Sequence, residues 1–464
     1  MTAAGPQGAD PGLGLPTLLG LASGAILVPL NSTMLAVALP SLRHEFGVSA
    51  STVALLVTLY LGSVVVALPV SGVLGDRFGH RRAFLAGVAG FAASSLLAAA
   101  AQAFVMLALA RVLQAASGAL VSVSAIALVR LAAPDRRRGA AFGIFDMLVS
   151  TSAAVGPFIG GVLVSTLGWR WLFLVAVPVA TLAGISVGLL LKVGTDPKPR
   201  GSGERSIDGI GLAVLALLLV ALLAAIHGVS GLPGWLAWLG AGLLLAAFIG
   251  RELTALHPAV DLRLFRRVGY SAAVAGVLGM TVVLHGSFIL VPLQVQELLH
   301  GSATLSGIVL LGISGVAALA APFGGRASDL LGRRAPAVAG AALVAMALFG
   351  LWLATAAASV LLLALLLGLM GLGMGLSGSP RQAAALEAVD PGTIGMAAAT
   401  YSTGRYLGGV LGATLAGGVL AGGVTTAGVG LGYGLLAGVG VGVVVVSMAL
   451  PARRGASQLA SEKV

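Results

Sequence analysis

The sequence predicts an all-α polytopic membrane protein, and three observations support this fold class. The 464 residues are 58% hydrophobic and only 9% charged, whereas a soluble domain carries about a quarter charged residues. Apolar runs of about 20 residues, the length that crosses a bilayer as a helix, recur along the chain. Glycine accounts for 69 residues, and small residues let helices pack closely in a bilayer. This composition argues against a water-soluble enzyme.

The apolar runs predict about fourteen membrane-spanning helices, arranged as six, two and six. Residues 1–15 are Gly- and Pro-rich and are interpreted as a cytoplasmic tail. Six apolar runs follow within residues 16–192, and they predict the first six-helix bundle. The expected helices in this bundle lie near 16–40, 52–74, 83–101, 104–130, 139–165 and 171–192.

The second half of the chain repeats this organisation after an insert. Residues 193–207 contain several Pro and Gly residues with mixed charges, which is typical of a solvent-exposed linker, here cytoplasmic. Two apolar runs in 208–250 predict a two-helix insert, and the charged stretch 251–270 predicts a second cytoplasmic linker. Residues 271–450 form the second six-helix bundle, with helices expected near 271–296, 304–325, 337–356, 358–378, 394–420 and 425–450, before the cytoplasmic tail 451–464.

The basic residues set the predicted orientation. Lys and Arg accumulate in cytoplasmic loops near helix ends, and an N-terminus inside leaves only Arg43 and Arg170 in outer loops. Arg381 is counted with the cytoplasmic loop residues, because its helix is expected to end at 378. Both termini are therefore expected in the cytoplasm. The net charge of +11 is then explained by anionic lipid headgroups, without nucleic acid as a partner.

A short pattern repeats in equivalent loops. Gly-x-x-x-Asp-x-x-Gly-x-Arg begins at Gly72 and again at Gly325, after the second helix of each six-helix set. This spacing predicts two parallel repeats. Acids at helix ends beside Arg predict charge locks that hold the cytoplasmic side closed in one state, although simple loop capping is an alternative. The candidate gating residues are Gly72, Asp76, Arg77, Gly79, Arg81, Asp329 and Arg333.

Four motifs resemble those of the major facilitator superfamily, and among its members the fourteen-span drug:proton antiporter family. Residues 72–82 resemble the superfamily's loop motif A, and residues 111–118 resemble its motif B. Residues 31–40 resemble a first-helix motif of the fourteen-span family. The antiporter motif C is matched by Gly156, Pro157, Gly160 and Gly161. The resemblance implies a proton-coupled exporter of amphipathic drugs or antibiotics that works by alternating access in the cell membrane. One position departs from the family, because Asn31 stands where an acid is usual.

Three residues are candidates for proton coupling. Ionisable side chains within the membrane are functional candidates by default. Asp146 lies in the predicted helix 139–165 and is the expected proton site, with a structural ion pair to nearby Arg residues as the alternative. Arg111 is expected to tie proton binding to conformation, or else to anchor helix packing. His285 has a side chain suited to proton relay, although a lone His in a membrane is more often structural.

The candidate substrate-binding residues are Asn31, Gln114, Arg405 and Gln294. Asn31 is expected to line the pore as a neutral hydrogen-bonding group, or to make a helix-helix contact. Arg405 is expected to contact substrate or to bond between helices. Since Arg111 and Arg405 outnumber Asp146, neutral, zwitterionic or anionic compounds are expected to be preferred over dications.

Other chemistry is scarce in the sequence. Cysteine is absent, and neither a metal-ligand cluster nor a nucleotide-binding loop is recognisable. No cofactor is expected apart from the proton as coupling ion, and no metal. The predicted partners are the substrate, protons and the lipid bilayer, and a monomer is expected. The alternatives are a facilitator or symporter of a small organic solute that does not work by antiport, and a membrane sensor on a transporter scaffold.

Overall fold

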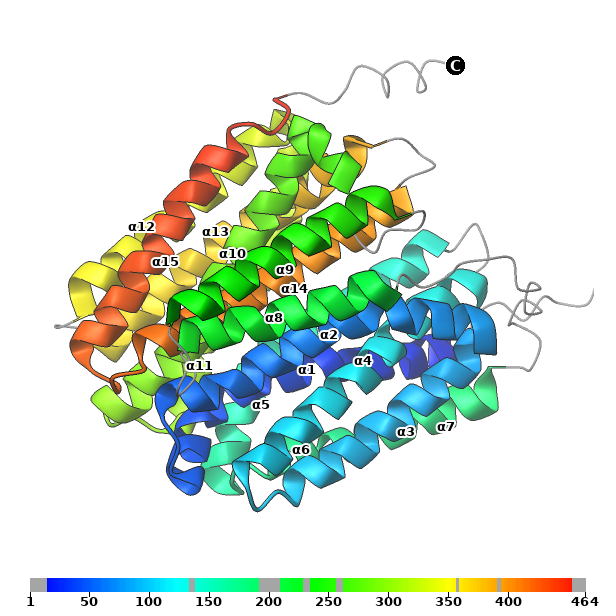
Figure 1. Cartoon of the computed structure of the whole chain (residues 1–464), viewed down its shortest axis with the longest axis horizontal. Helices are drawn as coiled ribbons and strands as arrows, with labels where there is room; N and C mark the ends of the chain where they lie inside the picture. The colour runs from blue at the N-terminus through cyan, green and yellow to red at the C-terminus, as the bar shows by residue number, and fades with distance from the viewer. Residues whose placement is uncertain are drawn as a thin grey trace, which may run out of the picture.

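The structure is a computed structural model that describes residues 15–132, 138–191, 209–227, 234–255, 262–355, 359–389 and 394–452. Every regular element within these ranges is a helix. The helices run side by side as a thick bundle (Figure 1). An all-helical fold satisfies each backbone polar group within its own segment, which is what a bilayer requires.

The first helical set occupies the N-terminal part of the chain. α1 packs against α5, α7 and α4, while α3 packs against α4 and α7. Ser49 caps α2 by accepting a hydrogen bond from the backbone N–H of Thr52 at 3.1 Å. α6 and α7 follow one another closely and together form one candidate span, Trp171–Leu190. The elements are α1 (Leu15–Phe46), α2 (Ala50–Phe78), α3 (His80–Ala99), α4 (Phe104–Ala132), α5 (Arg138–Thr166), α6 (Trp171–Leu174) and α7 (Ala176–Leu190).

The rest of the chain forms a helix pair and a second set. α11 packs against α13, α10 packs against α14, and α12 packs against both α13 and α15. The pair is α8 (Gly209–His227) and α9 (Gly234–Thr254). The second set begins after the 3-10 helix η2 (Leu262–Arg266) and contains α10 (Val268–Leu293), the π-helix η3 (Gln294–Leu298), α11 (Ala303–Leu331), α12 (Arg334–Ala354), α13 (Val360–Glu387), α14 (Ile394–Val419) and α15 (Thr426–Ser447).

Twelve of the described helices are long and apolar enough to cross a membrane. The expected count of fourteen is not confirmed. α8 is not among the twelve because its described apolar stretch, Gly209–Leu222, is short. α14 is not among them either, since it is glycine-rich and carries Arg405 in its middle, which lowers its hydropathy.

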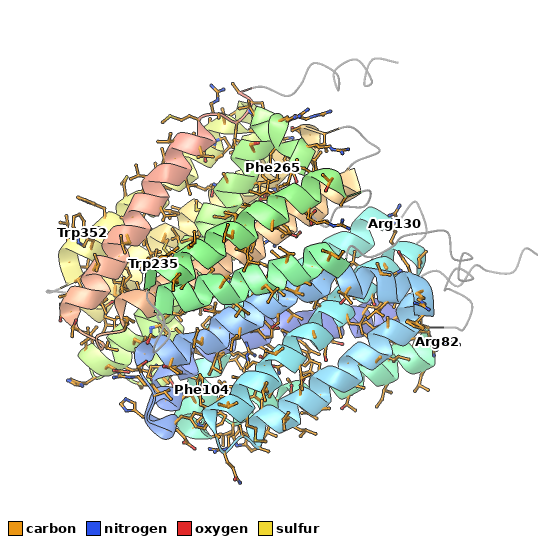
Figure 2. The ribbon with its side chains drawn as sticks, in the orientation of Figure 1. Arg82, Phe104, Arg130, Trp235, Phe265 and Trp352 are labelled. Carbon is orange, nitrogen blue, oxygen red and sulfur yellow. The ribbon has the colours of Figure 1, made fainter. Side chains whose placement is uncertain are left out.

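The two helical sets pack against each other through α5 with α11, α2 with α14 and α1 with α10. α8 and α9 pair with one another, and α8 also contacts α2 and α14 (Figure 1). The insert therefore lies alongside the line where the two sets meet. Figure 2 shows Arg82 and Arg130 at one end of the helices and Phe104 at the opposite end.

Candidate functional site

A buried polar cluster joins four helices of the first set. Arg111 of α4 is fully buried, and its Nη1 donates to the side-chain oxygen of Asn31 on α1. The same nitrogen donates to Oε1 of Gln114 at 2.7 Å, and Gln114 in turn donates to Ser95 of α3 at 2.8 Å. The Arg111 guanidinium lies 3.9 Å from the centre of the Tyr60 ring on α2. The charge of Arg111, whose transfer into lipid would be unfavourable, is thus stabilised by neutral hydrogen-bond acceptors and by the face of an aromatic ring.

This cluster brings together three residues named from the sequence. Arg111 and Gln114 are three positions apart and so lie on one face of α4, and the bond between them agrees with that placement. Asn31 is 3% exposed, and it contacts Arg111 in this structure. Ser95 and Tyr60 were not predicted, because a single Ser or Tyr in an apolar run carries no spacing signal. Since the bonded partners of Arg111 among the described residues are all neutral, these groups leave its positive charge unpaired.

Asp146, the expected proton site, lies on α5. Its side chain is outside the described part of the structure. About eight residues separate it from the start of α5, which places its backbone roughly 12 Å along the helix. Its role in proton coupling therefore stays a prediction.

His285 and Gln294 lie in the second set. The Nδ1 of His285 is 3.1 Å from the carbonyl oxygen of Thr281, one turn earlier on α10. A Cβ on Gly409 of α14 would lie 3.1 Å from the same ring, so His285 packs against α14. Gln294 is buried and accepts a hydrogen bond from the Tyr433 hydroxyl at 2.8 Å, which ties η3 to α15.

Two arginines lie along α13 and α14. Arg405 is exposed on α14, between Tyr401 and Tyr406. Arg381 was assigned from the sequence to a cytoplasmic loop, and this assignment is wrong. α13 continues through Pro380 to Glu387, and Arg381 is only 2% exposed. Proline is tolerated inside membrane helices where neighbours compensate the lost bond, so the helix does not end at 378 as expected.

The glycines of motif C lie where α5 approaches two other helices. A Cβ on Gly156 would overlap the Thr33 hydroxyl of α1, and one on Gly160 would lie 2.9 Å from the Met34 carbonyl oxygen. On Gly161 it would lie 2.6 Å from the carbonyl oxygen of Ala303, at the start of α11. These distances leave no room for a side chain. At Gly160 and Gly161 glycine is required by the close approach of the backbones, whereas at Gly156 it leaves space for the Thr33 side chain.

Further contacts join the two sets at the same end of the molecule. Arg43 of α1 forms an ion pair with Glu297 of η3. The Thr304 hydroxyl of α11 lies 2.9 Å from that of Ser165 on α5. Gln296 donates to the carbonyl oxygen of Val37 on α1 at 3.0 Å. These bonds hold together the helix ends that the sequence predicts to be extracellular.

The repeated loops have matching geometry at the other end. Gly79 ends α2 with φ +92°, and Gly332 ends α11 with φ +81°, a region that favours glycine. Arg81 donates to the carbonyl oxygen of Gly188 in α7 at 2.7 Å, and Arg334 donates to that of Leu450, just after α15, at 2.7 Å. Each repeat therefore uses its Arg to satisfy a carbonyl at the end of its own last helix.

The acids of the repeat pair locally. Asp76 lies 3.2 Å from His80, and Asp329 lies 3.2 Å from Arg333, each pair four residues apart. Arg333 also bonds Glu387 of α13 at 2.5 and 3.1 Å. The hydrogen bonds with Glu387 hold the pKa of the Arg333 guanidinium above its usual value.

The two remaining gating candidates, Arg77 and Gly72, make few contacts with other helices in the described part of the structure. Arg77 is exposed and lies 5.5 Å from the Phe78 ring centre, and a Cβ on Gly72 would meet open space. Among the described residues, no group of three or more His, Asp or Glu could hold a metal ion.

Two helical sets of parallel design, a buried polar cluster and glycine-mediated contacts between the sets define a membrane transporter rather than an enzyme. The chain belongs to the Major Facilitator Superfamily, whose profile matches residues 21–292 and 271–463. It is therefore an integral membrane protein.

Relatives and solved structures agree with this class. The chain is 33% identical over 364 residues to the tetracenomycin C resistance and export protein of Streptomyces glaucescens, covering 77% of this chain and 67% of the relative. It is 30% identical over 400 residues to a multidrug resistance protein B homolog of Mycobacterium tuberculosis, covering 84% and 73%. The crystal structure of a peptide transporter POT in complex with sulfate superposes with a TM-score of 0.72 at 15% identity, covering 96% of this chain and 95% of that one. The last likeness concerns the fold alone.

Proposed function

We propose that the protein exports amphipathic small molecules, of the drug or antibiotic class, across the cell membrane in exchange for protons. The observation that carries the proposal is the likeness, at 30–33% identity, to proteins named for resistance and export. The protein is proposed to act as a monomer, without a cofactor other than the proton.

We further propose that α8 and α14 also cross the bilayer, which makes fourteen spans with both termini in the cytoplasm. α14 has 26 residues, or roughly 39 Å of helix, and it packs between the candidate spans α10 and α2. The orientation is supported by Arg82 and Arg130 at one end and by Trp235 and Phe104 toward the other (Figure 2), since basic residues favour the inside. A reporter that fluoresces only in the cytoplasm tests this topology: fused to the C-terminus it should be bright, and fused directly after α8 or after α14 it should be dark. A dark C-terminal fusion, or a bright fusion after either of these two helices, would contradict the topology.

The proposed cycle is alternating access between the two sets. With the outer ends joined through α5 and α11, substrate would enter from the cytoplasmic side. A proton arriving from outside would bind Asp146 in the outward-facing state and favour the return. The proton can drive the cycle only through different affinities for the two states.

Transport in everted membrane vesicles tests the coupling. A panel of amphipathic compounds is measured with and without an imposed pH gradient, for the wild type and for Asp146→Asn. Gradient-driven uptake by the wild type and its loss in the variant are expected. Glu45→Gln is the matched control, because Glu45 is an exposed carboxylate paired with Arg170 at the outer surface. Unchanged uptake by Asp146→Asn would contradict the assignment of the proton site.

A transporter that does not exchange protons is the second candidate. The observation in its favour is that Arg111 is bonded to the neutral Asn31, at a position where the resemblance led us to expect an acid. In that case transport would follow the substrate gradient alone, and collapsing the pH gradient would leave it unchanged.

A further inference from the structure

Arg381 of α13 is a buried cation, and some of its N–H donors have no acceptor among the described residues. A guanidinium carries five N–H donors. The side chain is 2% exposed, and in the described part of the structure neither Nε nor Nη2 has a hydrogen-bond partner. Buried donors without acceptors are destabilising, so a fold retains such a group at a cost in stability. An acceptor brought by a ligand would remove that cost.

The surroundings of Arg381 come from three helices. α13 packs against both α10 and α14. A Cβ on Gly276 of α10 would lie 2.7 Å from Nε and from Cδ of Arg381, so the side chain lies directly against the α10 backbone. Tyr401 of α14 lies close enough to both Arg381 and Arg405 to interact electrostatically with their charges. The hydroxyl of the neighbouring Thr400 is also buried, with no hydrogen-bond partner among the residues that the structure describes.

The charge of Arg381 is not matched by the nearest acid on its own helix. Glu387, six residues further along α13, is bonded through both carboxylate oxygens to Arg333. Arg405 adds a second positive charge beside Tyr401. The junction of α10, α13 and α14 therefore carries positive charge, and the unbonded N–H groups of Arg381 can donate hydrogen bonds to an anion.

The three groups also lie at different depths from one end of α13 and α14. Arg381 is six residues before the end of α13, or roughly 9 Å from it. Tyr401 and Arg405 are seven and eleven residues into α14, which starts at the same end, or roughly 10 and 16 Å. This end is the one proposed to face the cytoplasm. A molecule entering from there would meet Tyr401 and Arg381 first and Arg405 afterwards.

We propose that Arg381, together with Tyr401 and Arg405, binds the carboxylate or a similar oxyanion of the exported compound on the cytoplasmic side. The proposal rests on the export function proposed above and narrows its substrates to amphipathic anions. A guanidinium suits this task, because its planar fork can bond both oxygens of a carboxylate. A lipid phosphate shares this chemistry, and the experiment separates the two sources.

Binding to the purified full-length protein in lipid nanodiscs tests the proposal without requiring transport. Three probes share one aromatic body: naphthalene-2-carboxylate, naphthalene-2-carboxamide and a naphthylmethyl trimethylammonium. Because a hydrogen bond to a charged group contributes about 1.5–3 kcal/mol, the carboxylate should bind at least about 10-fold more tightly than the amide. No carboxylate binding at millimolar concentration, or equal affinity for all three probes, would overturn the proposal.

Variants separate recognition from structure. Arg381→Gln should reduce carboxylate affinity to that of the amide, and Arg381→Lys should keep part of the preference. Arg82→Gln is the matched control, because it removes the same charge from an exposed position on α3. Without ligand, Arg381→Gln should melt at the wild-type temperature or higher, since an unpaired buried charge is removed. A lower melting temperature would identify Arg381 as a structural group and refute the assignment.

A second titration distinguishes the exported compound from a lipid headgroup, and it uses nanodiscs of phosphatidylcholine with and without phosphatidylglycerol. The tighter binding of the carboxylate than of the carboxamide should persist in both. If phosphatidylglycerol abolishes it, the site binds a lipid headgroup and the assignment to the exported compound fails. Export without any anion preference would refute the anion site and leave the proposed export function unaffected. Anion binding that depends on Arg381, without export, would support the anion site and refute the proposed export function.

Discussion

Replacing Gly307 with Ala should open the side of the transporter that is proposed to be extracellular. Gly307 lies near the start of α11, and a Cβ there would overlap the carbonyl oxygen of Pro157 and lie 3.1 Å from the Phe158 Cα on α5. Both contacts are backbone, so no side-chain rotation relieves them. Overpacking of this kind costs about 1–3 kcal/mol. Because the strain exists only while α5 and α11 are in contact, it should lower the population of the outer-closed state.

The size of the shift follows from that strain. A cost of about 1–3 kcal/mol changes the equilibrium between the two states about 5- to 150-fold. Ser165→Cys and Thr304→Cys provide the readout, because their hydroxyls lie 2.9 Å apart across the same interface. The native chain has no cysteine, so disulfide formation between the pair has no background. Gly307→Ala should slow this crosslinking, by up to the same factor, because the rate follows the population of the outer-closed state.

Gly373→Ala is the matched control within a single set. A Cβ on Gly373 of α13 would overlap the carbonyl oxygen of Gly340 on α12, but these two helices belong to the same bundle. This variant should lower the melting temperature and leave the crosslinking rate of the folded protein unchanged. Equal crosslinking rates in Gly307→Ala and its parent would refute the reasoning, as would equal slowing by the control.

Three further predictions concern the charged contacts. Asn31→Asp gives Arg111 a charged partner and should raise the free energy of unfolding by about 1–3 kcal/mol, while making vesicle transport depend more steeply on the pH gradient; a lower melting temperature would contradict this. Glu297→Gln removes an ion pair between the two sets, and because such pairs contribute up to about 1 kcal/mol when partly exposed, the outer cysteine pair should crosslink up to about fivefold more slowly. Arg333→Gln breaks charged hydrogen bonds and should lower the free energy of unfolding by about 2–3 kcal/mol, as measured by denaturation in detergent. The control Arg77→Gln, at an exposed position, should change this free energy by less than about 0.5 kcal/mol.

The fold was largely predictable because its signals are local. Runs of apolar residues form helices in a bilayer whatever their neighbours are, so the described helices lie close to the predicted segments. One helix boundary was wrong: α13 was expected to end at 378, whereas it continues through Pro380 to Glu387. The repeated Gly and Arg pattern predicted two equivalent loops, and Gly79 and Gly332 do end α2 and α11 with positive φ.

The site was predictable only where helical periodicity relates its residues. Arg111 and Gln114 are three positions apart, so their shared face was expected, and they are hydrogen-bonded. The contribution of Tyr60 could not be predicted, because an aromatic residue in an apolar helix is more often simply packed. Arg381 was misplaced because its burial depends on Gly276, which is more than one hundred positions earlier in the chain.

Composition and short spacing are enough to predict that this protein lies in a membrane, that it is helical, that its two halves repeat and which family motifs it carries. They do not predict which charges are paired, and the three-dimensional packing of the helices was needed for that. Arg43 bonds Glu297, 254 positions away, Arg111 bonds a neutral Asn31, and Arg381 has two buried nitrogens that find no partner among the described residues. The physical reason is that the energy of a charge within a helical bundle depends on the groups that the other helices bring to it, and packing alone selects those groups.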